Sequence, residues 1–323
     1  MLFVTNRFPK QSIRTRNGRK FNFDLKNNAP SNSVFFCEKG SNEDHTEIGS
    51  LEFLKRLKEC QSKQILLFVH GFNNLPTQVF EMASDLQELC DKKERNEVLV
   101  VPLIWPCDND LGIVDDYWDD QKSADQSGYS FARVLEKFLA WRNADANEPE
   151  STPCLKRINL LAHSMGNRVL RQTLGSWNQY DLASGVPLIF RNTFMVAADV
   201  VNETLHEGQT GELIAHASRN VVVYYASDDL ALRASKAANL KNKIASRRLG
   251  HTGPENIKLT LRNVFQVDCD DINTQYDMPK GHNYFRHGND SSQSGLVFDH
   301  IFQCMKNGRV FPDNPEQRSV ILK

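Results

Sequence analysis

The sequence predicts an α/β protein: a mostly parallel, doubly wound sheet of eight strands between two layers of helices. Two observations support this prediction. Eight short apolar runs recur along the chain, and amphipathic segments separate most of them. From the third run onward the runs are almost continuously apolar, which is typical of strands buried on both faces of a parallel sheet. The chain has 323 residues, so we expect one large domain over residues 1–323.

The composition is that of a globular protein without a strong charge bias. Hydrophobic residues make up 40% and charged residues 24% of the chain, and the formal net charge is −1. This balance gives no reason to expect binding to nucleic acid or to an anionic membrane surface. No apolar run is long enough to cross a bilayer. Seven cysteines without a CxxC pair, and an N-terminus unlike a signal peptide, indicate reduced thiols and a cytoplasmic protein.

The predicted elements follow from these runs and from the periodicity between them. Strands are expected at 2–5, 33–37, 64–69, 98–104, 157–162, 192–198, 220–225 and 263–267. In the segment 76–91, apolar side chains recur at spacings of three and four after Pro76, which predicts a helix. Similar reasoning predicts helices at about 50–60, 129–142, after Ser164, 229–241 and 294–306. Alternation of strands and helices is the pattern of a doubly wound sheet.

Two segments, 106–127 and 270–293, are expected to be irregular insertions at the carboxyl edge of the sheet, and no large separate lid is expected. The first segment is acidic. It lacks the glycine and glutamate placement of a calcium-binding EF-hand loop, which favours a solvated surface over a metal site. The aspartates concerned are Asp108, Asp110, Asp115, Asp116, Asp119, Asp120 and Asp125.

The five residues Ala-His-Ser-Met-Gly at 162–166 follow a predicted buried strand and open a predicted helix. A turn this tight forces its central residue, Ser164, into an unfavourable backbone conformation, and only small residues fit two positions before and after it. Ala162 and Gly166 meet that requirement. The turn would expose the Ser164 hydroxyl above the sheet, so Ser164 is the predicted nucleophile; a buried serine that caps the helix is the structural alternative.

The strand at 64–69 runs directly into the sequence HGFNN at 70–74. In nucleophile-elbow enzymes, the loop after this strand supplies one of two backbone N–H groups that bind the oxyanion. We therefore predict that the amides of Phe72 and Met165 form an oxyanion hole. His163 is adjacent to the nucleophile on a tight turn, where neighbouring side chains point apart, and we interpret it as a supporting residue.

A base and an acid are expected after the serine, in the order serine, acid, histidine. His282 lies on the loop after the last predicted strand, and a carboxylate must orient its ring. The alternative histidines are His251, His287 and His300. Asp229 follows the seventh strand and is the predicted acid, whereas its alternatives are Asp228 and Asp199. Asp268 and Asp270 are expected to cap a loop.

These motifs together resemble the poorly characterised, serine-hydrolase-like α/β hydrolases of bacterial genomes. The resemblance covers nearly the whole chain. It is carried by the Thr5-Asn6-Arg7 motif after the opening strand, VHGFNN at 69–74, LLAHSMGNRVL at 160–170, AAD at 197–199, the D-x-A-L element at 229–232 and GHNYF at 281–285. It implies the α/β-hydrolase fold and a Ser-Asp-His hydrolase.

The predicted function is hydrolysis of a carboxylic ester, thioester or amide through an acyl-enzyme on Ser164. The substrate would be a small molecule or an acyl ester, and the chemistry needs neither a metal nor an organic cofactor. An acyltransferase would use the same residues. An inactive scaffold of this fold, used for binding, would be expected to have a broken triad, and the sequence retains a candidate for each position.

Overall fold

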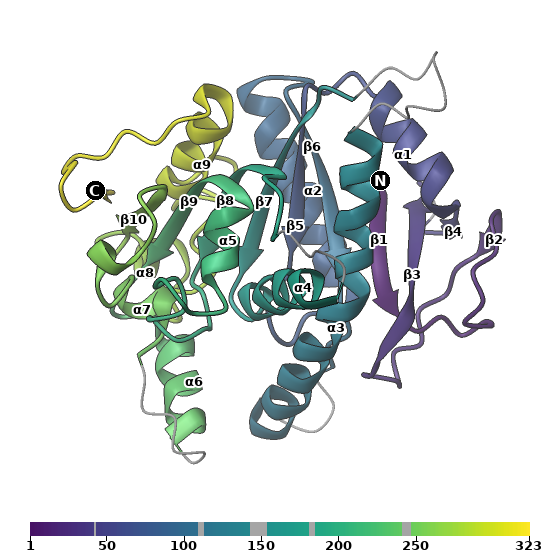
Figure 1. Cartoon of the computed structure of the whole chain (residues 1–323), viewed down its shortest axis with the longest axis horizontal. Helices are drawn as coiled ribbons and strands as arrows, with labels where there is room; N and C mark the ends of the chain where they lie inside the picture. Colours follow the sequence, from purple (N-terminus) through teal and green to yellow (C-terminus); the bar gives the residue numbers. More distant parts are fainter. Residues whose placement is uncertain (42, 109–112, 143–153, 181–184, 241–246) are drawn as a thin grey trace.

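The structure is a computed structural model of the chain (Figure 1). It describes residues 1–41, 43–108, 113–142, 154–180, 185–240 and 247–323. All eight predicted strands are present. They are β1 (Leu2–Arg7), β3 (Pro30–Lys39), β5 (Gln64–Val69), β6 (Val98–Ile104), β7 (Arg157–His163), β8 (Phe190–Val196), β9 (Ser218–Tyr225) and β10 (Val264–Asp268).

The predicted number of eight strands is too small, because the described residues form a sheet of eleven strands. The additional strands are β2 (Arg19–Lys20), β4 (His45–Glu47) and β11 (Ser319–Ile321). Each has only two or three residues and lies at or near an edge of the sheet. Strands this short contain no apolar run, so hydrophobic periodicity does not detect them.

The strand order is β11-β10-β9-β8-β7-β5-β6-β1-β3-β4-β2. Pairing is parallel from β11 to β1 and antiparallel from β1 to β2. The sheet is therefore mostly parallel, as predicted. The carboxyl ends of β5, β7, β8 and β9 lie side by side at one edge, where open α/β sheets bind their ligands.

Helices cover both faces of the sheet (Figure 1). The apolar cluster on one face takes side chains from α1 (Gly49–Glu59), α3 (Ile113–Arg142), α4 (Gly166–Tyr180), α5 (Glu212–His216) and α7 (Leu249–Thr252). The cluster on the other face takes them from α2 (Pro76–Lys93), α6 (Leu230–Leu240) and α9 (Leu296–Asn307). Figure 1 shows α3 and α6 extending past the carboxyl edge of the sheet, at the bottom of the view.

The prediction of an irregular segment over 106–127 is wrong from residue 113 onward, because α3 already begins at Ile113. Tyr117, Ala124, Phe131 and Phe138 recur every seven residues along α3 and are all buried in one apolar cluster. The acidic and amide residues between them hide this stripe in the sequence. Residues 109–112 lie outside the described part. The segment 270–293 is largely irregular, with one short helix, α8 (Asn273–Tyr276).

All seven cysteines carry free thiols, which agrees with the expectation from their odd number and spacing. Within the described ranges, no helix is both long enough and apolar enough to span a membrane. A short 3-10 helix, η1 (Ile257–Leu259), precedes β10.

A row of buried amide side chains crosses the sheet near the amino ends of four strands. Asn220 donates to Asn192 at 2.8 Å, Asn192 to Asn159 at 2.8 Å, and Asn159 to Gln64 at 3.1 Å. Three of these side chains also donate to backbone carbonyls at the end of α9: Gln64 to Met305, Asn192 to Cys304, and Asn220 to Gly308. The row thereby supplies donors to carbonyls at the end of α9, where helices leave carbonyls without an intrahelical partner; the Cys304 carbonyl also accepts from the Gly308 N–H.

We predict that Asn192→Ala destabilises the protein by about 2–4 kcal/mol, because it removes the donor to Asn159 Oδ1 and one of the two acceptors of the Asn220 amide in a buried site. Thermal and denaturant unfolding would measure the change. Asn289→Ala, at an exposed position, is the matched control and should change stability by less than about 0.5 kcal/mol. Equal effects of the two substitutions would contradict a stabilising role for the row.

Candidate active site

The turn after β7 has the backbone conformation that its sequence predicts. Ser164 has a φ of 52°, in the left-handed region that a serine rarely occupies. Hydrogen bonds fix the turn in this strained form. The Ser164 N–H donates to the Val196 carbonyl at 3.0 Å, and the Ser164 carbonyl accepts from the Asp199 N–H at 3.2 Å. The Asn167 side chain donates to the carbonyls of Ala162 and Ser164.

The space around this turn admits no larger residues. A Cβ atom added at Gly166 would lie 2.5 Å from the Val69 carbonyl oxygen, so α4 can start this close to β5 only with glycine there. A Cβ at Gly71 would lie 2.8 Å from the Ser164 Cβ. The loop after β5 therefore contacts the serine directly, which is the arrangement that a nucleophile elbow requires.

The loop after β5 is held rigidly by His70 and Trp105. The two rings stack at a centroid distance of 5.1 Å. His70 Nδ1 donates to the Gly71 carbonyl at 2.9 Å, and its Nε2 accepts from the Trp105 N–H at 3.1 Å. Complete burial lowers the pKa of His70 to about 4, so the ring is neutral, and these two contacts require the proton on Nδ1. His70 thus serves as a structural residue of the loop.

Two backbone N–H groups, one on each of the two turns, have no acceptor within the described chain. In the part of the chain that the structure describes, neither the Phe72 N–H nor the Met165 N–H donates a hydrogen bond to a protein acceptor. Two carbonyls of the same loop do have partners, because the Asn74 side chain donates to the Gly71 carbonyl at 3.0 Å and to the Phe72 carbonyl at 2.8 Å. Unpaired amides are uncommon inside proteins, and a pair beside a strained serine is suited to binding an oxyanion.

Asp120 of α3 anchors the same loop from the other side, a contact that the sequence analysis missed. Its carboxylate accepts from the Asn73 N–H at 3.0 Å, the Asp108 N–H at 3.2 Å and the Asn28 side chain at 2.9 Å. Burial raises the pKa of Asp120 to about 7, although these hydrogen bonds act in the opposite direction.

The interpretation of the 106–127 aspartates as a solvated surface is therefore wrong for three of them. Asp108, Asp116 and Asp120 are all buried. Their burial follows from the position of α3 against the loop after β5, and an acidic composition alone cannot reveal such packing. Asp110 lies outside the described residues.

Asp229 and His282 come together from segments that are far apart in the sequence. His282 Nδ1 lies 2.7 Å from Asp229 Oδ2. The other carboxylate oxygen of Asp229 accepts from the Leu232 N–H at 3.0 Å, at the start of α6. Asp229 is fully buried, whereas 12% of the His282 side chain is exposed. Burial on its own disfavours the charged ring, but the Asp229 carboxylate outweighs it and raises the pKa of His282 above the ordinary value.

The loop that carries His282 is fixed next to the serine turn. His163 Nε2 donates to the His282 carbonyl at 3.1 Å, and the two rings lie 4.8 Å apart. Asp277 accepts from the N–H groups of His282 and Asn283, at 2.7 and 2.8 Å. Burial lowers the pKa of His163 well below its usual value, and the nearby His282 adds to this effect. His163 is thus a neutral supporting residue; the role of Asp277 had no signal in the sequence.

The alternative acids have other partners. Asp199 accepts from the Tyr117 hydroxyl at 2.9 Å and the Ser235 hydroxyl at 2.6 Å, and it lies 3.2 Å from Arg248 Nε. Asp228 accepts from the Asn273 side chain at 2.6 Å. Asp268 and Asp270 accept hydrogen bonds within loops, from the Asp270 N–H and from Ser227 respectively.

The alternative histidines also lie in other surroundings. His300 of α9 shares a 2.7 Å hydrogen bond with the Tyr224 hydroxyl, and burial lowers its pKa to about 4. His287 Nε2 lies 3.6 Å from Asp85 on α2. His251 is part of the short helix α7. Among the described residues, His282 alone forms an ion pair with the carboxylate that was predicted from the sequence.

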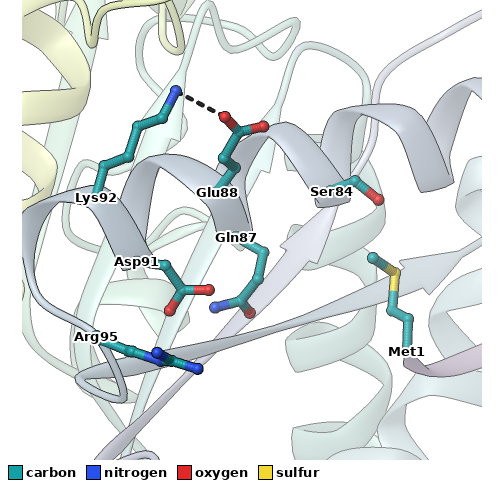
Figure 2. A pocket seen from close by; sticks show the side chains of 7 residues that line it. All are labelled: Met1, Ser84, Gln87, Glu88, Asp91, Lys92 and Arg95. Atoms are coloured by element: carbon teal, nitrogen blue, oxygen red, sulfur yellow. Dashed lines mark ion pairs between the residues drawn. The ribbon is translucent and has the colours of Figure 1, made fainter.

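A pocket of about 560 Å³ lies elsewhere on the molecule. It is lined by Met1 and, from α2 and the residues after it, Ser84, Gln87, Glu88, Asp91, Lys92 and Arg95. Figure 2 shows these polar side chains around it, with an ion pair between Lys92 and Glu88. Met1 directly precedes β1, so this pocket lies toward the amino ends of the strands and away from Ser164. Within the described chain, no group of three or more histidine, cysteine or acidic side chains is placed to hold a metal.

Comparison with known proteins identifies the family of the chain. A search of curated proteins found no match. A family model described as an alpha/beta hydrolase of unknown function (DUF900) matches residues 47–293. The match includes the turn after β5, the strained serine, Asp229 and His282. It covers most of the chain, and the protein therefore belongs to this family of alpha/beta hydrolases.

Proposed function

We propose that the protein is a serine hydrolase that cleaves a carboxylic ester through an acyl-enzyme. The observation that carries the proposal is the buried 2.7 Å contact between His282 Nδ1 and Asp229, held beside the strained Ser164 turn by His163. A carboxylate on Nδ1 keeps the proton on that nitrogen and leaves Nε2 free to act as a base. This arrangement is expected of a catalytic dyad that activates a serine.

In the proposed reaction, the Ser164 hydroxyl attacks the ester carbonyl carbon while His282 Nε2 takes the hydroxyl proton. The new bond between Oγ and carbon moves the carbonyl electrons onto oxygen, and the Phe72 and Met165 amides bind this oxyanion. Collapse of the intermediate breaks the bond to the leaving alcohol, which receives the proton from His282. Water then repeats the sequence on the acyl-enzyme and releases the acid and the free serine.

The supporting groups have separate tasks in this scheme. Asp229 orients the ring and stabilises the imidazolium that forms. His70 and Asp120 hold the loop that carries Phe72, so the amide does not need to reorganise during the reaction. His163 fixes the backbone of His282. An ester is preferred to an amide as substrate by analogy with the fold, and the set of residues would serve either.

We predict that a fluorophosphonate probe labels the wild-type protein and not Ser164→Ala, because only an activated serine attacks such a phosphorus centre. The measurement is covalent labelling followed by mass spectrometry of the modified peptide. Ser176→Ala, on the helix α4 that follows the serine turn, should be labelled like the wild type. A folded wild-type protein that remains unlabelled would contradict the proposal and support the inactive scaffold.

We predict that Asp229→Asn lowers kcat by about 10⁴-fold, whereas Asp199→Asn lowers it by less than about tenfold, since only Asp229 contacts the His282 ring. The pH profile of kcat/KM gives a second way to distinguish the roles of Asp229 and Asp199. The acid limb of the wild type should lie above pH 6.5, because the pKa of His282 is raised from that value. Loss of the Asp229 charge should move the limb to lower pH. A larger loss of activity in Asp199→Asn would identify Asp199 as the orienting acid instead.

We predict that Gly71→Ala lowers kcat by about 10²–10³-fold and destabilises the protein by about 1–3 kcal/mol. The added methyl group would lie 2.8 Å from the Ser164 Cβ, so the loop must shift and carry the Phe72 amide out of position. Gly40→Ala is the matched control, because its added Cβ meets nothing closer than 3.6 Å. Unchanged kcat in Gly71→Ala would argue against an oxyanion hole built on this loop.

A further inference from the structure

Tyr117 of α3 connects the two sides of the serine turn. Its ring packs edge-on against the Phe72 ring at a centroid distance of 5.6 Å, and its hydroxyl donates to Asp199 Oδ2 at 2.9 Å. Phe72 follows β5 and Asp199 follows β8, while β7, which leads into Ser164, lies between those two strands. The Tyr117 side chain therefore spans the carboxyl end of β7, where the proposed nucleophile lies.

The tyrosine is held firmly in this position. Its hydroxyl also accepts from the Gln121 side chain at 2.9 Å and lies 2.7 Å from the Ser235 hydroxyl of α6. Tyr117, Asp199 and Ser235 are each at most 6% exposed. A ring fixed by hydrogen bonds at its polar end and by an aromatic contact along its side has little freedom to move aside for a bulky ligand.

The proposed reaction determines where the carbonyl oxygen, the leaving oxygen and the acyl chain of a substrate lie around Ser164. In the acyl-enzyme, the carbonyl oxygen must face the Phe72 and Met165 amides, and the leaving oxygen must face His282. The acyl chain takes the direction that is left, beside the Phe72 side chain and away from His282. Tyr117 packs against the Phe72 ring and would therefore border the acyl chain. Ser164 itself is only 6% exposed.

We propose that Tyr117 forms the wall that limits the length of the acyl group, and that the substrates are esters of short acyl chains. This inference rests on the proposed function, and it names the substrate class of the same site. Asp199 then has a task distinct from that of Asp229: it fixes the hydroxyl of the wall residue, together with Ser235.

The first test is the kcat/KM of a series of p-nitrophenyl esters from acetyl to decanoyl. The wild type should prefer acetyl or butyryl over decanoyl by about tenfold or more. Tyr117→Ala should reverse or abolish that preference, whereas Tyr117→Phe, which keeps the ring, should retain it. Phe72→Ala keeps the backbone amide and the Asp199 hydrogen bonds, and it should also shift the preference toward longer chains. The control is Tyr129→Ala, at a 54% exposed position on the same helix.

The second test needs no turnover. Two p-nitrophenyl alkylphosphonates, ethyl and octyl, are compared by their rates of covalent labelling of Ser164. Faster labelling by the ethyl compound in the wild type, and loss of this difference in Tyr117→Ala or Phe72→Ala, support the wall. Equal rates in the wild type, or faster labelling by the octyl compound, overturn it and leave the serine hydrolase proposal intact. Failure of both compounds to label the folded wild type overturns the proposed function, and the wall with it.

Discussion

The close contact between β5 and the start of α4 is the constraint on which the site depends. Gly166 lies against the Val69 and His70 carbonyls, with no room for a side chain. This contact forces the chain to leave β7 through a tight turn, and Ser164 adopts a φ of 52° as a result. Strain of this kind persists only where surrounding interactions over-determine it. Here the Asn167 side chain and the Asp199 N–H supply those interactions.

The same constraint brings the other parts of the site into reach. Because the loop after β5 must pass directly beside the serine, its residue 71 cannot carry a side chain. Within the described chain, neither the Phe72 amide nor the Met165 amide donates to a protein acceptor. Hydrogen bonds of His70, Trp105 and Asp120 then hold the loop in place. The site is thus a rigid set of backbone groups, to which few side chains need to be added.

The sequence was sufficient for the parts of this arrangement that depend on local pattern. Continuous apolar runs located the eight longer strands, since burial on both faces leaves a strong signal. Ala162, Ser164 and Gly166 marked the turn, because only small residues fit there. By contrast, the first half of α3 was not predicted, because its buried positions include the polar residues Asp116 and Asp120, which interrupt the apolar periodicity. The partners of those side chains, such as Asn28 and Asn73, are distant in the sequence, and composition cannot identify them.

The two candidate acids show most clearly what sequence alone leaves open. Asp199 and Asp229 follow neighbouring strands, and both are buried, so their positions in the chain do not distinguish them. Their partners do. Asp199 lies 3.2 Å from Arg248 Nε and accepts from the hydroxyls of Tyr117 and Ser235, and its charge contributes less than that of Asp229 to raising the pKa of His282. Asp229 has one backbone donor and the His282 ring, so its charge acts mainly on that imidazole. Two identical side chains at one edge of the sheet can therefore perform different tasks, and the difference is created by groups that only the folded chain brings to them.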